Sequence, residues 1–184
     1  IYASNLIFTV RASYHFGAPV SGGWTKVNVF DREEDELIFS GEGILSDEGE
    51  KTFVVQTKGI KSVTEIDVEA YVWDESGVEV KAHGKTTYHP TEYEIRIKMP
   101  ESVDVGSTVS CNLFGDTART LRYVVRKWGD IIASGEVMLK EGKGTFDFTV
   151  ESPGLYDVEI WDNDLIVAKK RLYTSHWMRY SKKT

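Results

Sequence analysis

The sequence predicts an all-β protein made of two tandem immunoglobulin-like antiparallel β-sandwiches. Apolar residues repeat with a period of two along most of the chain, as Ile66, Val68 and Ala70 do in alternation with Glu65 and Asp67. Such alternation indicates strands with one face on a core and the other in water. No segment of ten or more residues combines a helical period with caps, and turn residues recur every dozen or so positions. Short strands with evenly spaced turns are typical of β-sandwiches.

The bulk composition is that of an ordinary globular protein. The 184 residues are 41% apolar and 28% charged, which suits one large domain or two small ones. No apolar run is long enough to span a membrane, so no membrane insertion is expected. The chain starts at Ile1 without a charged-then-apolar leader, so we expect a mature chain, a processed product or a piece of a longer protein. Its single cysteine excludes an intramolecular disulfide.

The first sandwich is predicted over residues 1–89, with a boundary near His89 and Pro90 as the hinge. Its opening strand should carry Tyr14 and Phe16 on the same alternating face as Phe8. Six strands are expected in this half, near residues 6–16, 24–30, 36–43, 51–57, 63–73 and 78–88.

The second sandwich is predicted over residues 90–174 and is followed by a basic tail, 175–184. Turn residues divide this half into seven strands, which is the strand count of an immunoglobulin-like domain. The strands are expected near residues 93–99, 107–114, 121–128, 131–139, 144–150, 155–161 and 165–173.

A tyrosine corner and a buried cysteine are predicted in the second sandwich. Tyr156 follows Pro153-Gly154 at the start of the sixth strand, where such a corner is expected. Val158 and Cys111 occupy the two positions at which antibody domains carry their disulfide. We therefore expect Cys111 to be a small buried hydrophobe that faces Val158, with a reactive thiol as the alternative.

Charge is distributed unevenly along the chain. Residues 1–89 hold 15 acidic and 8 basic side chains, whereas residues 90–184 hold 14 of each. After Asp164 there are six bases and no acid. A nucleic-acid binder would normally be dominated by positive charge, so nucleic acid is not expected as a partner. The basic terminus is expected to be a solvated tail, or else to associate with an acidic neighbour.

A stretch near the start that contains three glycines and a proline, "YHFGAPVSGG", lies between two runs of alternating apolar residues. Pro19 fixes φ, and the glycines permit conformations that other residues avoid, so the stretch predicts a turn. With its flanks it resembles the third macroglobulin domain of the alpha-2-macroglobulin and complement family, whose strand ends in a Tyr-x-Tyr/Phe-Gly-x-Pro-Val turn. The matching positions are Tyr14, Phe16, Gly17, Pro19 and Val20, followed by Gly22 and Gly23.

The resemblance extends over nearly the whole chain in layout and implies the third and fourth macroglobulin domains. It implies a non-enzymatic scaffold and interaction segment of a large secreted or surface protein that traps proteases or serves defence. The implied location is extracellular, at the cell surface or periplasmic, and the implied partners are neighbouring domains or identical subunits. A bait segment and a reactive thioester cannot be carried over, because no Cys-Gly-Glu-Gln motif occurs and Cys111 lies in mid-strand.

A complete domain of this type would have one more strand ahead of residues 6–16. The six residues "IYASNL" are scarcely long enough to supply it. An open sandwich exposes apolar core and an unpaired edge, which proteins rarely leave uncovered. The strand is expected either upstream in a longer chain or from a neighbouring subunit by strand addition, with "SHWMRYSKKT" as the donor.

No catalytic, cofactor-binding or metal-binding pattern is recognisable. The four histidines lack the spacing of a zinc site, and no nucleophile motif or phosphate-binding loop occurs. The acidic run from Asp31 to Glu36 lacks the ligand spacing of a calcium loop and is expected to be a hairpin turn, as is "WDND" from Trp161 to Asp164.

Two other function classes remain open from the residues. A self-assembling surface or filament subunit is suggested by the missing strand and the uneven charge. A carbohydrate-binding module has only the five tryptophans in its favour, and these are spread over different strands or lie beyond the last one.

Overall fold

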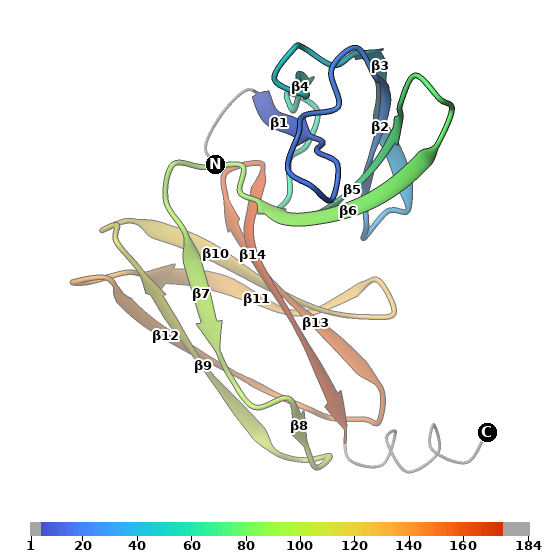
Figure 1. Cartoon of the computed structure of the whole chain (residues 1–184). Helices are drawn as coiled ribbons and strands as arrows, with labels where there is room; N and C mark the ends of the chain where they lie inside the picture. The colour runs from blue at the N-terminus through green and yellow to red at the C-terminus, as the bar shows by residue number, and fades with distance from the viewer. Residues whose placement is uncertain (1–4, 175–184) are drawn as a thin grey trace. The chain divides into compact units, whose positions relative to one another are not determined.

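The computed structural model describes residues 5–174, and these residues form strands and turns without an α-helix (Figure 1). The predicted all-β, immunoglobulin-like fold class is confirmed. The described residues separate into two compact units, each with its own core. The first unit contains residues 5–60 and 64–88, and the second contains 61–63 and 89–174.

The first unit consists of a four-stranded and a two-stranded antiparallel sheet. The larger sheet has the strand order β3-β2-β5-β6, and the smaller one pairs β1 with β4. The strands are β1 (Asn5–Arg11), β2 (Trp24–Asp31), β3 (Glu36–Ile44), β4 (Glu50–Gln56), β5 (Thr64–Trp73) and β6 (Glu79–Tyr88).

The core of the first unit lies between these two sheets. On β2 and β4 the buried side chains alternate with more exposed ones, as the period of two predicts. The buried members are Leu6, Val27, Val29, Phe53, Val55, Ile66 and Tyr88.

The first strand is shorter than the sequence predicts. It ends at Arg11 rather than near residue 16, because the backbone then folds back on itself. The chain returns through a bridge between Ser13 and Pro19, and the Val20 N–H donates to the Ala12 carbonyl at 3.0 Å. Tyr14 and Phe16 therefore belong to a turn, not to a face of the sheet.

The second unit has a five-stranded sheet, β11-β10-β13-β14-β8, facing a three-stranded sheet, β12-β9-β7. The strands are β7 (Ile95–Lys98), β8 (Ser102–Val103), β9 (Thr108–Gly115), β10 (Thr120–Lys127), β11 (Asp130–Met138), β12 (Lys143–Thr149), β13 (Leu155–Asp162) and β14 (Leu165–Thr174).

The chain enters the second unit by switching sheets between two short edge strands. β7 pairs antiparallel with β9, and after Pro100 the short β8 pairs parallel with the end of β14. Proline has no N–H to donate to a ladder, so it suits the point where one pairing ends. The sequence predicts a single strand over 93–99 here, and the second short pairing is an addition to that prediction.

Candidate functional site

The opening turn is held by backbone hydrogen bonds. The Tyr14 N–H donates to the Ala18 carbonyl, and the Gly17 N–H donates to the Tyr14 carbonyl, both at 2.8 Å. Gly17 has a φ of 91°, a conformation that side chains with a Cβ avoid. Val20 points into the unit and is buried, so it anchors the end of the turn.

The tip of this turn presents two stacked aromatic rings to solvent. Tyr14 and Phe16 have ring centroids 5.2 Å apart and nearly parallel planes. The Phe16 side chain is 69% exposed, contrary to the alternation that places it on the face of Phe8. The reason is the early end of β1, after which the period of two no longer applies.

A neighbouring glycine fits against the back of the turn. Gly49 has a φ of 73°, and a Cβ built on it would lie 2.4 Å from the Ala12 carbonyl oxygen and 3.1 Å from the Val20 nitrogen. The Ala12 N–H in turn donates to the Gly49 carbonyl at 2.9 Å. The turn and the start of β4 therefore approach each other through a residue that has to be glycine.

Tyr156 forms a hydrogen-bonded corner in the second unit. Its hydroxyl donates to the Ser152 carbonyl at 2.7 Å, and its ring is buried beside Phe148. The Gly154 N–H donates to the Thr174 hydroxyl at 3.0 Å, which ties the same turn to the end of β14. The predicted corner residue thus connects a turn to the core.

Cys111 is fully buried in the same core as Val158 and Tyr156. Its Sγ lies 3.7 Å from the Met99 Sδ, and it sits opposite Phe146 in the β9–β12 pairing. Burial raises the pKa of the thiol to about 12, and the nearby Asp147 carboxylate adds to the rise. A buried thiol with a raised pKa stays protonated at neutral pH, and the contacts of Cys111 are those of a packing residue.

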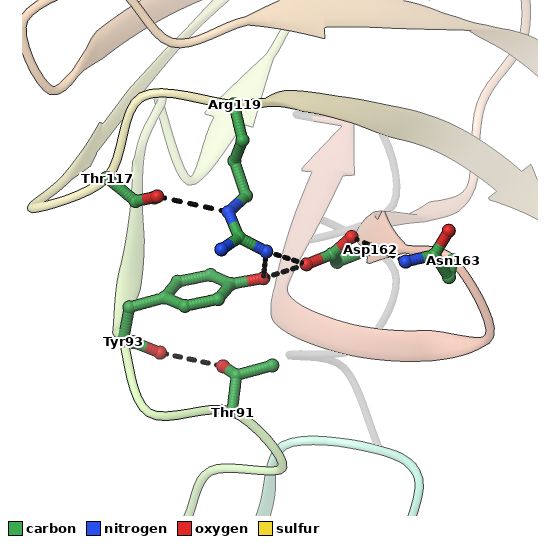
Figure 2. A network of polar contacts seen from close by, with 6 residues as sticks. All are labelled: Thr91, Tyr93, Thr117, Arg119, Asp162 and Asn163. Atoms are coloured by element: carbon green, nitrogen blue, oxygen red, sulfur yellow. Dashed lines mark hydrogen bonds and ion pairs between the residues drawn. The ribbon is translucent and has the colours of Figure 1, made fainter.

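A polar network that sequence reasoning did not find lies in the second unit (Figure 2). The Tyr93 hydroxyl donates to Asp162 Oδ2, and Arg119 Nη1 donates to the same oxygen and to the Tyr93 hydroxyl. The Arg119 guanidinium also lies over the Tyr93 ring, 4.2 Å from its centroid. Thr117 accepts a hydrogen bond from Arg119 Nε at 3.0 Å, and Asn163 donates to the other Asp162 oxygen at 3.1 Å.

The network joins three segments that are far apart in the sequence. Tyr93 precedes β7, Arg119 precedes β10, and Asp162 ends β13. The carboxylate and the guanidinium form an ion pair, and the Tyr93 hydroxyl is hydrogen-bonded to both. We interpret this cluster as a clasp that fixes one end of the second unit, because its contacts join the segments before β7 and β10 to the end of β13.

Replacing Asp162 with alanine is expected to destabilise the second unit by about 2 kcal/mol. The side chain is only 14% exposed and accepts charge-assisted hydrogen bonds, which contribute more than neutral ones. Asp164→Ala is the control, because this exposed carboxylate lies two residues further along and its ion pair with Lys61 is solvated. Urea unfolding should separate the two variants, and equal losses would contradict the clasp.

The Tyr93 hydroxyl should make stability depend on pH in the alkaline range. Burial and the Asp162 carboxylate raise the pKa of Tyr93 to about 12. In the unfolded chain tyrosine ionises near pH ~10, so the unfolded state loses this proton first and the free energy of unfolding falls between about pH 10 and 12. Because the ring is part-exposed, we expect a fall of about 1–2 kcal/mol.

The control for this prediction is Tyr93→Phe. Its free energy of unfolding should be lower at pH 7 and should fall less steeply than that of the parent above about pH 10. Cys111 is present in both proteins, so its own titration cancels in the difference. Identical alkaline slopes in urea unfolding would show that Tyr93 does not carry the effect.

Two of the five tryptophans meet on the outer face of the first unit. Trp24 on β2 and Trp73 on β5 are paired across the strands, with ring centroids 4.7 Å apart. Tyr71 stacks beside Trp73 at 5.9 Å, and Lys81 lies over the Tyr71 ring at 4.9 Å. Strand register therefore gathers aromatics that are separated in the sequence, although their planes are not all parallel.

An open groove of about 530 Å³ lies along one side of the first unit. Its walls are Ile7–Arg11 of β1, Val68 and Ala70 of β5, and Ala82–Thr86 of β6. The floor of the groove is apolar, and Ala70, Ala82 and Gly84 in its walls have small side chains. The space beside these three residues can therefore hold large side chains.

The acidic run and the histidines form no metal centre in residues 5–174. The Asp31 carboxylate instead accepts hydrogen bonds from the Glu33 N–H at 2.9 Å and the Thr64 hydroxyl at 2.7 Å, which closes the hairpin turn. Within that range no group of three potential ligands is suited to a cation. The same range contains no helix with the length and apolar character needed to cross a bilayer.

Solved structures of bacterial alpha-2-macroglobulins contain this arrangement of strands. Trypsin-activated alpha-2-macroglobulin from Escherichia coli matches 92% of the chain with a TM-score of 0.65 at 16% sequence identity. The native conformation of the E. coli protein matches 94% with a TM-score of 0.69 at 14% identity. Salmonella alpha-2-macroglobulin reacted with methylamine matches 92% with a TM-score of 0.65 at 13% identity.

The chain has the fold of alpha-2-macroglobulin domains. The resemblance seen in the sequence is therefore confirmed at the level of fold. The present chain corresponds to 15% of the length of each of these three proteins. No protein-family model matches the sequence, and no curated protein matches it.

The residues that the sequence analysis singles out as structural fall into two groups in this fold. Tyr14, Gly17, Pro19 and Val20 build the opening turn of the first unit, while Cys111, Tyr156 and Val158 lie in the core of the second. Each group has a packing or turn-forming role that the contacts explain.

Proposed function

We propose that this chain is a non-enzymatic scaffold and interaction segment of a macroglobulin-like secreted or surface protein. The observation that carries the proposal is the fold match to bacterial alpha-2-macroglobulins over 92–94% of the chain. The burial of Cys111 and the hydrogen bonds that join Tyr93, Arg119 and Asp162 support a structural role for the residues that would otherwise be candidates for chemistry.

The parent protein is proposed to be a protease trap or a defence protein located outside the cytoplasm. This part rests on analogy with proteins of which the chain would form 15% of the length. A trap of this kind needs a bait segment and a thioester, and no Cys-Gly-Glu-Gln motif occurs in these 184 residues. Both elements would have to lie elsewhere in the parent.

The test is to sequence the gene upstream and downstream of the region that encodes these 184 residues, and to isolate the gene product from the native organism. We expect an open reading frame that encodes a Cys-Gly-Glu-Gln motif, and a protein in the periplasm, at the surface or in the medium. Incubation with trypsin should give a covalent complex that the protein pretreated with methylamine does not form. If the parent protein lacks the motif, the protease-trap part of the proposal is wrong and the scaffold part still stands.

A second candidate is a self-assembling subunit completed by strand addition. It is favoured by one observation, the groove between β1 and β6. The two candidates make different demands on the isolated chain. A scaffold segment has no reason to polymerise by itself, whereas a strand-exchanging subunit does so at sufficient concentration.

A further inference from the structure

The second unit contains an edge strand for which the first unit has no counterpart among the described residues. In the second unit β9 pairs with β12 on one side and with β7 on the other. The corresponding strand of the first unit, β1, pairs with β4 and, within residues 5–174, with no second strand. Likewise β14 is bordered by β8, whereas β6 ends its sheet. Among the described residues, β1 and β6 thus each have one edge without a strand partner.

Burial differs between the units at these matching strands. The inward side chains of β9, namely Val109, Cys111 and Leu113, are fully buried. On β1 only Leu6 is fully buried, while Phe8 and Val10 are part-exposed. β6 is exposed on both faces from Glu79 to Lys85. Within residues 5–174, no strand covers the apolar floor of the groove.

The walls specify what kind of cover fits. Ala70, Ala82 and Gly84 are small, and a Cβ built on Gly84 would have its nearest neighbour, the Val68 Cβ, at 4.0 Å. In the second unit β7 supplies large side chains at alternate positions, among them Ile95 and Ile97. The groove therefore fits an extended strand that carries a large, weakly polar side chain at every second position.

We propose that residues 175–184 of a second copy of this chain fill the groove as a strand antiparallel to β1. This segment lies outside the described residues, which end with β14 at Thr174. As a strand, it would place His176, Met178 and Tyr180 on one face and Trp177, Arg179 and Ser181 on the other. The first face supplies the large side chains that the small walls of the groove require.

Charge and length agree with this donor. Residues 1–89 carry 15 acids and 8 bases, a net charge of −7, whereas residues 175–184 carry three bases and no acid. The bases that line the groove lie beside acids, since Arg11 pairs with Glu50, Lys85 pairs with Asp67, and His83 Nδ1 lies 4.0 Å from Glu69 Oε1. Ten extended residues reach about 33 Å, so a strand of about five leaves a short connection to the end of β14.

A contact between residues 175–184 of one copy and the first unit of the next copy is a head-to-tail contact. Such contacts produce rings when the rotation between copies closes, and open filaments when it does not. The assembly should therefore be a closed ring of two or more copies, or a series of open oligomers. This inference rests on the second candidate function and is independent of the scaffold proposal.

The first experiment compares the full chain with a chain that ends at Thr174. Light scattering on a size-exclusion column, over a hundredfold range of concentration, should show multiples of 20.8 kDa for the full chain and a monomer for the shortened one. High salt should shift the full chain towards monomer, because opposite charges contribute to the contact.

Point variants separate the tail from the groove. Met178→Asp should weaken association by about tenfold or more, while Ser181→Asp, which makes the same charge change on the opposite face, should weaken it much less. Gly84→Leu should fill the groove and block association, whereas Gly59→Leu, at a residue with open space around it, should leave association unchanged. Melting of both glycine variants checks that the first unit is folded.

The outcomes are decisive in both directions. Assembly that needs the tail and is lost in Met178→Asp and Gly84→Leu supports the proposal. The proposal is wrong if the full chain stays monomeric at every concentration, whether or not its own tail occupies the groove. Assembly that persists in the shortened chain also overturns it. None of these results bears on the reading frame of the parent gene, so the scaffold proposal is tested separately.

Discussion

Replacing Val158 with aspartate is expected to unfold the second unit while the first unit keeps its own unfolding transition. Val158 is fully buried and pairs with Val125 in the centre of the β10–β13 ladder. A carboxylate there would lose hydration without gaining a partner, at a cost of more than about 4 kcal/mol. This is comparable to the whole stability of a small domain, so the unit should lose cooperative folding.

The control for this variant is Val105→Asp, the same chemical change at a side chain that is 43% exposed. It should alter the free energy of unfolding by less than about 1 kcal/mol. Hydrogen exchange read by mass spectrometry should show loss of protection in residues 89–174 of Val158→Asp and normal protection in residues 5–60. Simultaneous loss in both regions would mean that the two cores unfold as one cooperative block.

Replacing Gly49 with alanine is expected to destabilise the first unit by about 3 kcal/mol. The new Cβ would meet the Ala12 carbonyl oxygen at 2.4 Å, and the backbone φ of 73° is unfavourable for any residue with a Cβ. Relief would require β4 and the opening turn to move apart, which would disturb the backbone hydrogen bonds of Ala12. The mechanism is steric, so the difference in stability from the parent should not depend on salt.

Gly59→Ala provides the matched comparison in the same unit. No heavy atom lies within 4 Å of the Cβ that it would gain, and no unusual φ is required. Its effect should be within about 0.5 kcal/mol of zero, or slightly stabilising through the unfolded chain. Urea unfolding followed by calorimetry measures both variants. If the two alanines cost the same, the close approach at Gly49 is not a constraint on the fold.

Much of the fold could be predicted because strand patterns are local. Alternation in residues 64–73 is visible in any short window, and glycine and proline mark the turns between windows. The opening turn illustrates where this reasoning stops. The alternation continues through Tyr14 and Phe16, but the chain already turns back at Ser13, so both rings lie outside the sheet.

The polar clasp could not be predicted, because its members are distant in sequence and individually ordinary. Arg119 lies 26 residues after Tyr93 and 43 before Asp162. Their meeting depends on sheet order and register, which local propensity does not determine. The same applies to Trp24 and Trp73, which become neighbours only through the pairing of β2 with β5.

The parallel pairing of β8 with β14 has a mechanical consequence for the second unit. The segment around β8 is joined to the end of β14. The Tyr173 N–H donates to the Glu101 carbonyl at 2.9 Å, and Thr174 lies opposite Val103 in the parallel pairing. Tension applied to the chain on either side would load these parallel strands along their length, so their hydrogen bonds would have to break together and not one after another. The second unit should therefore resist stretching more strongly than a hairpin peeled from its open end.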